Sequence, residues 1–359
     1  MSTFVRQLCN DVITENFTFR FPNRLPILMY HRILPAPDPL QPDALTAAQF
    51  SQQIDLLQQY FTVLPLDEAL ARLKAEQLPP KTVAITFDDS YRETRLLAAP
   101  ILHRAGVHAT AFLSTDHLYL GTRPSLMFND FIRESIRHSP LTTLDTSPLG
   151  LPGVHSLIGN NHKIALISKL EHFIKYQTLP LRQQSLDALR SLTRVEPSLV
   201  APRMMMTPEE VRELEWLNIT IGGHTHTHPI MTQTTPADLR KDLELNLRVL
   251  RSLTSQRVRA FAYPNGRFPV DFTLDHAALI RSLGYSWAVS THCAVASPSD
   301  NPFLVPRFAT KETGYRFLWR ILRMLKFDKH PASGLVLPSK IVESTSASTP
   351  ASTATSYTA

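Results

Sequence analysis

Two short clusters of reactive side chains stand out in the 359-residue sequence. The first is Asp88-Asp89, which directly follows the β-rich run Thr82–Phe87. The second is the segment His224–His228, in which three histidines alternate with threonines after two glycines. Neutral imidazole and carboxylate groups are common ligands of divalent transition metals. Each cluster alone has an ordinary explanation, an acidic turn or a histidine-rich surface loop, but together they indicate a metal centre.

The chemistry of such a centre follows from its ligands. Two histidines and one carboxylate leave an open coordination position, which distinguishes a catalytic metal site from a closed structural one. A divalent cation held in this way polarises water, and a neighbouring carboxylate can accept the proton as the water attacks a carbonyl. We expect Asp89 to bind the cation and Asp88 to be the base. Without a cation, two adjacent buried carboxylates would be costly.

Alternating strand and helix patterns must bring these clusters together. Buried strands are predicted at residues 26–34, 82–87, 108–113, 219–221, 258–263, 287–290 and 304–308. Helices are predicted near residues 50–60, 66–73, 91–104, 211–216, 235–253 and 274–283. This alternation predicts a parallel sheet, open or closed into a barrel. Asp88, Asp89, His224 and Asn265 each follow a predicted strand, and the carboxyl edge of such a sheet is where active sites lie.

Two regions interrupt this pattern. An insertion over about 119–203 is rich in Leu, Ser and Pro, with helical character near 163–176 and 183–193. Residues 336–359 end in a low-complexity run of Ser, Thr and Ala that we expect to be disordered. The predicted organisation is one catalytic domain over residues 1–335, with the insertion inside it, followed by this tail.

Composition limits the class of protein. The formal net charge of +6 fits a soluble enzyme with surplus Lys and Arg, or attraction to an anionic partner such as an acidic polysaccharide or lipid headgroups. No nucleic-acid-binding module is recognisable. Two cysteines, Cys9 and Cys293, cannot form a disulfide framework. Because the sequence shows neither a signal peptide nor a membrane span, we expect a location in the cytoplasm or at the membrane surface.

A basic apolar segment lies near the C-terminus. Arg316, Arg320 and Arg323 share one face of a predicted helix whose other positions are strongly apolar. Such a helix can pack on the barrel, or it can lie on a membrane as a basic amphipathic helix. The second interpretation predicts peripheral membrane contact through residues 315–330.

Both reactive clusters resemble motifs of the polysaccharide deacetylases, also called the NodB-homology group or carbohydrate esterase family 4. Residues 86–91, Thr-Phe-Asp-Asp-Ser-Tyr, are similar to the first motif, and residues 224–229, His-Thr-x-x-His-Pro, to the second. The resemblance covers about 26–118 and 204–310. It implies a distorted (β/α) barrel of about seven parallel strands, and a divalent metal, zinc or else cobalt, nickel or manganese. The roles it implies are Asp88 as general base and Asp89, His224 and His228 as metal ligands, whereas His226 is not a ligand.

Further segments resemble one branch of that family, the exopolysaccharide and poly-N-acetylglucosamine deacetylases: residues 29–33, 261–266 and 305–308. The third motif of the family departs from the pattern, because Ala262 replaces an arginine that holds the base. Asn265 replaces a tyrosine whose backbone N–H binds the oxyanion, a role that does not depend on the side chain. We expect Arg307 to substitute for the missing arginine and the backbone of Asn265 to serve the oxyanion.

The family's late Leu-x-His motif, which supplies the general acid, is not visible in the sequence. His31 is the first substitute and His292 the second, although either can be an ordinary histidine at a strand end or in a loop. The sequence thus predicts a metal-dependent hydrolase that removes N-acetyl groups from an N-acetylated sugar in a polysaccharide or its precursor. A metal-dependent amidohydrolase acting on a non-sugar amide and a catalytically decayed glycan-binding protein are the alternatives.

Overall fold

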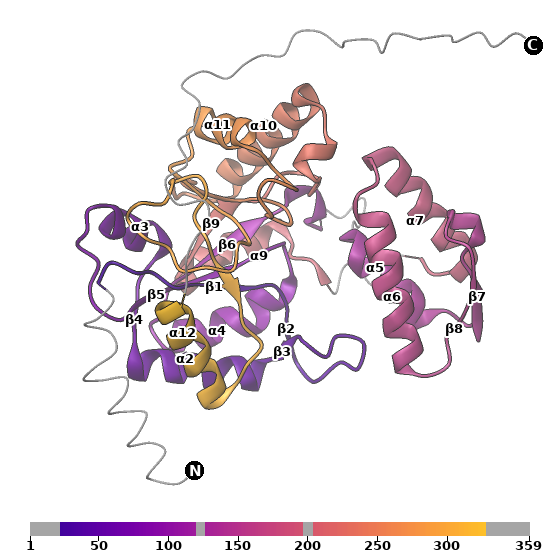
Figure 1. Ribbon diagram of the computed structural model, residues 1–359, viewed down its shortest axis with the longest axis horizontal. Coiled ribbons are helices and arrows are strands. Elements are labelled where there is room, and N and C mark those ends of the chain that lie inside the picture. The colour runs from indigo at the N-terminus through magenta and orange to yellow at the C-terminus, as the bar shows by residue number, and fades with distance from the viewer. Residues whose placement is uncertain (1–21, 120–125, 197–203, 328–359) are drawn as a thin grey trace, which may run out of the picture.

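A parallel sheet forms the centre of the protein in the computed structural model, which describes residues 22–119, 126–196 and 204–327 (Figure 1). Its path of seven strands, with an eighth strand beside β5, agrees with the predicted distorted barrel. In sheet order these strands are β11 (Trp287–Val289), β10 (Ala260–Ala262), β9 (Ile219–Gly223), β6 (Ala109–Leu113), β5 (Thr82–Phe87), β1 (Ile27–Tyr30) and β12 (Phe308–Ala309), and β4 (Thr62–Val63) pairs with the start of β5.

The stretch Val305–Phe308 joins the two edges of this sheet. Its first residue forms a parallel bridge to β11, and its last residue pairs with β1. The sequence predicted a continuous strand over 304–308, which is wrong. Pro306 has no N–H to donate, so regular pairing lapses between the bridge and β12. Arg307 therefore lies at an irregular closure of the barrel, where its side chain is fully buried.

Helices cover the outside of the sheet, and their apolar faces supply most of the core. They are α2 (Ala47–Tyr60), α4 (Ala99–Arg104), α9 (Pro208–Glu213), α10 (Pro236–Leu253), α11 (Leu274–Ser282) and α12 (Gly314–Phe327), with α3 (Leu66–Lys74) on a second apolar cluster. The expected cap at Thr207 is confirmed, because its hydroxyl accepts from the N–H of Glu210. The short helices beside them are η3 (Thr115–His117), η6 (Leu214–Leu217) and η7 (Met231–Gln233).

Two predicted elements near the first reactive cluster are interrupted. The strand expected over 26–34 ends at Tyr30, and β2 (Ile33–Leu34) pairs instead with β3 (Leu45–Thr46) in a separate sheet. The chain therefore leaves the barrel at His31.

The helix expected over 91–104 begins with a π-helical turn, η2 (Thr94–Ala98), before α4. Pro100 in this helix has no N–H to donate. The wider π-helical turn before it accommodates the missing hydrogen bond.

The insertion forms a lobe with its own hydrophobic core (Figure 1). The helices expected near 163–176 and 183–193 are present and longer than predicted, whereas an additional helix and a hairpin were missed. The lobe consists of α5 (Phe128–His138), β7 (Thr143–Asp145), η4 (Ser147–Leu149), β8 (Val154–Ser156), α6 (Asn160–Lys175) and α7 (Leu179–Thr193).

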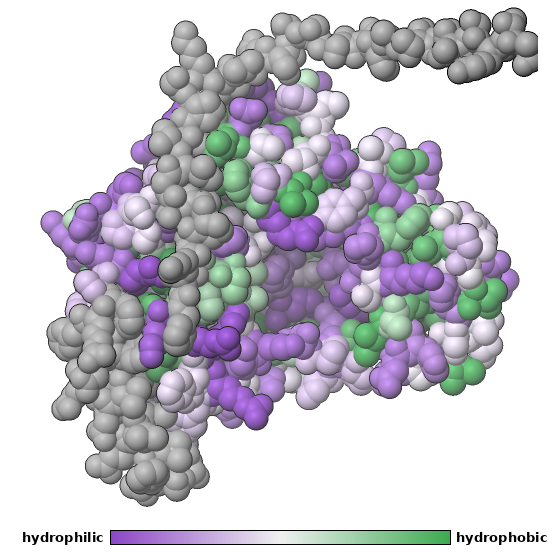
Figure 2. Space-filling view, in the orientation of Figure 1, coloured by the Kyte–Doolittle hydropathy of each residue, from purple (hydrophilic) through white to green (hydrophobic). Residues whose placement is uncertain are grey.

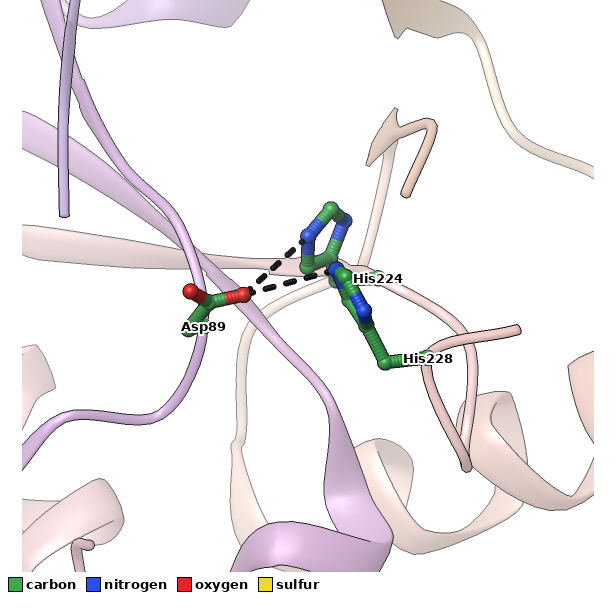
Figure 3. Close-up of side chains that lie close together, drawn as sticks. All are labelled: Asp89, His224 and His228. Carbon is green, nitrogen blue, oxygen red and sulfur yellow. Dashed lines mark ion pairs between the residues drawn. The ribbon is translucent and has the colours of Figure 1, made fainter. Parts of the chain in front are cut away.

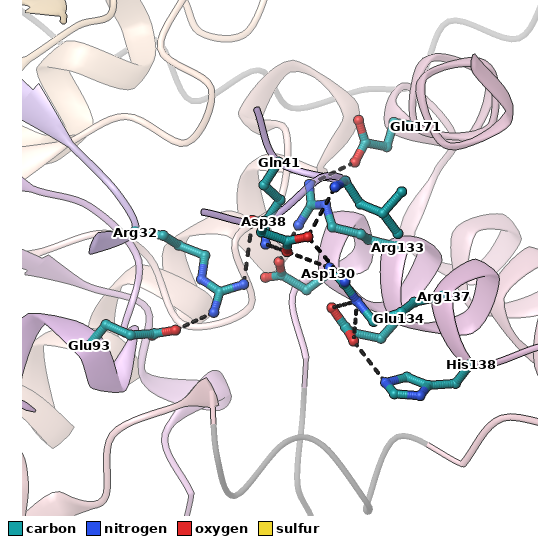
Figure 4. Close-up of polar contacts among 11 residues, drawn as sticks. Arg32, Asp38, Gln41, Glu93, Asp130, Arg133, Glu134, Arg137, His138 and Glu171 are labelled. Atoms are coloured by element: carbon teal, nitrogen blue, oxygen red, sulfur yellow. Dashed lines mark hydrogen bonds and ion pairs between the residues drawn. The ribbon is translucent and has the colours of Figure 1, made fainter. Parts of the chain in front are cut away.

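Charged side chains connect this lobe to the barrel (Figure 4). Arg137 of α5 donates hydrogen bonds of 3.1 and 2.5 Å to the two carboxylate oxygens of Asp38, in the loop before β3. The hydroxyl of Tyr91 donates a buried 2.6 Å hydrogen bond to Asp130 of α5. Since Tyr91 lies two residues after Asp89, the lobe is attached beside the first reactive cluster.

The C-terminal helix α12 packs on the barrel through the apolar face that the sequence indicated. Phe317, Leu318 and Ile321 are buried in the main core, whereas Trp319 is 52% exposed. Among the described residues, no helix has the length and hydropathy needed to cross a bilayer. Membrane contact through residues 315–330 stays a prediction, and residues 328–330 and the tail 336–359 lie outside the described residues.

Gly222, in strand β9, allows a test of how closely the strands of the sheet pack. A β-carbon at Gly222 would lie 2.4 Å from Cδ1 of Phe112 and 2.9 Å from the carbonyl oxygen of Ala260. We therefore expect Gly222→Ala to lower the free energy of unfolding by about 1–3 kcal/mol, because neighbouring strand and ring atoms must move. Chemical denaturation measures this change. A variant as stable as the wild type would show that the strands are not so closely packed.

Candidate metal centre

Asp89, His224 and His228 converge at the carboxyl ends of β5 and β9 (Figure 3). Oδ1 of Asp89 lies 3.5 Å from Nε2 of His224 and 3.6 Å from Nε2 of His228. One ligand atom from each residue lies within 4.8 Å of the other two. These are the three ligands that the sequence indicated, brought from positions more than a hundred residues apart to one point.

The hydrogen bonds of these side chains suit metal binding. Nδ1 of His224 donates a 2.8 Å hydrogen bond to the carbonyl oxygen of Ala262, which fixes the tautomer that leaves Nε2 free as a ligand. Oδ1 of Asp89 is buried and has no hydrogen-bond partner among the described residues. A buried carboxylate oxygen without a donor is costly, and a cation between it and the two imidazoles would remove that cost. The residues present therefore fit a divalent metal.

Helix α10 holds the histidine loop in place. The carboxylate of Asp242 accepts hydrogen bonds from the backbone N–H groups of His226 and Thr227, at 2.6 and 2.9 Å. One helical turn later, the buried amide of Asn246 donates a 2.6 Å hydrogen bond to the carbonyl of Thr225. The sequence analysis missed both residues. Its available signal was Asn246, a polar residue within the apolar stripe of an otherwise amphipathic helix.

The ligand-bearing backbone adopts an uncommon conformation. Asp89, Thr225 and His228 have φ angles of +66°, +63° and +52°, in the left-handed region that non-glycine residues rarely occupy. Such conformations persist where surrounding contacts over-determine them, and they concentrate at functional sites. Here they turn the ligand side chains toward one another.

Arg307 binds Asp88 through both of its terminal nitrogens. Nη1 donates to Oδ1 at 2.6 Å and Nη2 to Oδ2 at 2.5 Å. The same guanidinium donates to the hydroxyl of Thr86 at 3.1 Å and, through Nε, to the carbonyl of Ser290 at 3.2 Å. Arg307 thus lies against Asp88, the residue beside which the sequence analysis expected it in the absence of an arginine at position 262.

These contacts set the protonation states. Burial would raise the pKa of Asp88, but the charge of Arg307 outweighs that effect and lowers the pKa below its usual value. Burial lowers the pKa of His228 to about 3. Near neutral pH the site therefore holds an ionised carboxylate at Asp88 and a neutral imidazole at His228, the forms needed for a base and a metal ligand.

The other predicted residues lie at different distances from this centre. Nε2 of His31 lies 4.0 Å from Oδ2 of Asp88, and its side chain is 46% exposed. Asn265 follows β10 in a left-handed turn with φ +58°, and its carbonyl accepts from the hydroxyl of Thr291. His226 is not part of the triad: its Nδ1 is hydrogen-bonded to the hydroxyl of Thr115, and its Nε2 lies 3.6 Å from Oδ1 of Asp116. The backbone N–H of His292 donates to the hydroxyl of Ser290, and its carbonyl accepts from the N–H of Arg307.

Two cavities reach the centre. The larger, about 620 Å³, includes His31, Asp89 and Tyr91, and the surface view shows a hydrophilic hollow between barrel and lobe (Figure 2). The smaller, about 260 Å³, includes His228 and residues of α7. Asp89 and His228 are therefore reached from two different cavities.

The pH dependence of stability tests the state of His228. In the folded, metal-free protein this imidazole binds a proton only near pH 3, whereas in the unfolded chain it does so near pH 6.5. Between these values protons favour the unfolded chain, so the stability supplied by neutral His228 falls as the pH falls. We expect His228→Gln to flatten this part of the curve of unfolding free energy against pH. His226→Gln, from the same loop, is the control, and an unchanged slope in His228→Gln would contradict the assignment.

Comparisons with known proteins agree with this geometry. The family model described as Polysaccharide deacetylase matches residues 75–129 and 184–287, which contain all three triad residues and Asp88. A comparison with curated proteins found no match.

Among solved structures, the Streptococcus pyogenes deacetylase PplD in complex with acetate is similar at a TM-score of 0.55 and 18% identity, covering 85% of this chain and 99% of that one. IcaB from Ammonifex degensii gives 0.53 and 18%, covering 85% and 97%. A de-N-acetylase from Aggregatibacter actinomycetemcomitans gives 0.52 and 14%, covering 82% and 98%. At these identities the structural likeness establishes the fold.

The family match supplies what the fold alone does not. Its two segments carry both reactive motifs, and the insertion lies largely between them. Over these two segments the chain carries a polysaccharide deacetylase domain, and the enzymes with this domain are hydrolases that act on carbon–nitrogen bonds other than peptide bonds.

Proposed function

We propose that this protein is a metal-dependent de-N-acetylase that releases acetate from an N-acetylated sugar in a polysaccharide or its precursor. The observation that carries the proposal is the convergence of Asp89, His224 and His228 beside Asp88, with a buried oxygen of Asp89 left without a donor. The match to the polysaccharide deacetylase model supports the reaction, and the acetate bound to the Streptococcus pyogenes deacetylase is the product that such a reaction releases.

Asp88 is the proposed base. A divalent cation at the triad, zinc or else cobalt, nickel or manganese, would polarise the water and the acetamide carbonyl. The carboxylate of Asp88 accepts one proton of the attacking water as the new C–O bond forms, and the nitrogen of the sugar takes a proton from the general acid as the C–N bond breaks. Arg307 occupies one side of each Asp88 oxygen, and each oxygen keeps a further lone pair for the water proton.

Two further residues complete the proposed machinery. The backbone N–H of Asn265, in its left-handed turn after β10, is the proposed donor to the oxyanion that develops on the carbonyl oxygen. His31 is the proposed acid for the leaving amine, because it lies 4.0 Å from Asp88 and lines the larger cavity. Its imidazole is half exposed to solvent.

Separate substitutions distinguish metal binding from proton transfer. We expect Asp88→Asn to retain the metal and lose at least about 99% of the acetate release, since general base catalysis contributes about 10²–10⁴-fold. His228→Ala should lose both metal and activity, whereas His226→Ala should keep the metal. The measurements are metal content and acetate release from N-acetylglucosamine oligomers, with simple amides as alternative substrates. Full activity in Asp88→Asn would reject the mechanism, and activity on simple amides alone would reject the sugar substrate.

The pairing of Arg307 with Asp88 makes a prediction about pH. Arg307→Met removes the charge that lowers the pKa of Asp88, so the carboxyl ionises only at higher pH. We expect the acid limb of the activity profile to move to higher pH, and Arg307→Lys to produce a smaller shift. The profile of kcat/KM against pH measures this effect. Lower activity without displacement of the limb would mean that Arg307 supports the fold and does not set the ionisation of Asp88.

A further inference from the structure

The smaller cavity lies between the metal centre and the inserted lobe. Its walls are contributed by η3 and the histidine loop of the barrel, and by α5 and α7 of the lobe. The apolar part of the lining consists of Leu126, Met127, Phe128, Leu179 and Leu186. A volume of about 260 Å³ exceeds the space of a single water, so the cavity can take a substituent of a sugar.

Arg182 lines this cavity and lacks an opposite charge. Its residue is only 7% exposed, and no carboxylate among the described residues forms an ion pair with it. Nε is buried without a hydrogen-bond partner, and the guanidinium lies 4.7 Å from the centre of the Phe128 ring. Burial lowers the pKa of Arg182 to about 10, which still leaves it charged near neutral pH. The internal segments 120–125 and 197–203 contain neither Asp nor Glu in the sequence.

A second buried group faces the same space. His117, in η3, is 6% exposed, and its Nδ1 is buried without a hydrogen-bond partner among the described residues. Together with His228, it lines the cavity on the barrel side. The one acidic residue of the lining, Asp116, is half exposed and lies 3.6 Å from His226. The cavity therefore joins a metal ligand to two buried polar groups with unsatisfied nitrogens.

Arg182 also has a contact within the lobe. Its Nη2 donates a 2.8 Å hydrogen bond to the carbonyl of Lys175, the last residue of α6. That bond stabilises the helix end, but a neutral side chain could make it too. The hydrogen bond to Lys175 does not explain why a charged guanidinium is buried here, since a buried cation without a counterion is energetically costly. An oxyanion in the cavity would supply the missing partner, and the apolar walls would strengthen the attraction.

We propose that this cavity binds an acidic substituent, carboxylate or phosphate, carried by the glycan next to the N-acetylated sugar, with Arg182 as its cation. The inference rests on the proposed de-N-acetylase function and narrows its substrate to acidic glycans or their phosphorylated precursors. It also gives the inserted lobe a role, because Arg182 belongs to α7 while the metal ligands belong to the barrel. The net charge of +6 is consistent with such a substrate.

The test compares acidic and neutral probes in Arg182→Gln, which keeps a donor for Lys175 but removes the charge. The probes are glucuronosyl-N-acetylglucosamine, N-acetylglucosamine 6-phosphate and the neutral diacetylchitobiose. We expect the metal-loaded variant to lose about 10- to 100-fold in affinity for one or both acidic probes and less than about twofold for the neutral one. Titration calorimetry measures binding, and the acidic probe affected identifies carboxylate or phosphate.

The matched control is Arg190→Gln. Arg190 lies on the same helix with its guanidinium 6.0 Å from the Phe131 ring, but it is paired with Asp187 and does not line the cavity. Repeating the titration after the metal has been removed by chelation distinguishes two binding sites. Binding of an acidic probe to the metal would be abolished, whereas binding at Arg182 would persist. Equal losses for acidic and neutral probes, or no loss at all, would overturn the proposal. Absence of acetate release from every probe would reject the proposed function instead, because binding is measured independently of turnover.

Discussion

Two neighbouring carboxylates buried at the end of one strand are the constraint around which this site is organised. Asp88 and Asp89 are both nearly inaccessible, at 2% and 8% exposure, and their mutual repulsion must be balanced from outside the strand. The fold balances them differently. Asp88 receives a bidentate guanidinium, while one oxygen of Asp89 faces two imidazoles without a donor. One carboxylate is thereby kept ionised and the other is left to bind a cation.

Positioning depends on elements that carry no reactive group. Helix α10 fixes the histidine loop through Asp242 and Asn246, and the irregular closure before β12 delivers Arg307 to the interior. The lobe is attached through Tyr91 and Asp130, and Tyr91 lies only two residues after Asp89. A buried hydrogen bond thus connects the lobe directly to the chain segment that carries the first reactive cluster.

Much of this arrangement could be predicted from local patterns. Buried strands ending in polar residues, and the capped helix at Thr207, follow from periodicity and capping chemistry that act over a few residues. Two motifs indicated that Asp89, His224 and His228 would meet, and the structure brings these three side chains together. Features decided by contacts between distant segments were missed, such as the break at His31, where the chain leaves the sheet to pair elsewhere. Arg182 was missed for the same reason: in the sequence it is one arginine of an amphipathic helix, and only the folded lobe places it opposite His228.

The late position of Arg307 in the chain has a consequence for biosynthesis. Strand β5 and the histidine loop can assemble while the ribosome is still translating, but the countercharge of Asp88 arrives only with the final closing segment. A nascent chain that ends before residue 307 would hold an acidic pair with no guanidinium to neutralise it, and would resist complete burial of β5. Formation of the buried ion pair at Asp88 is thus coupled to synthesis of the segment that closes the barrel.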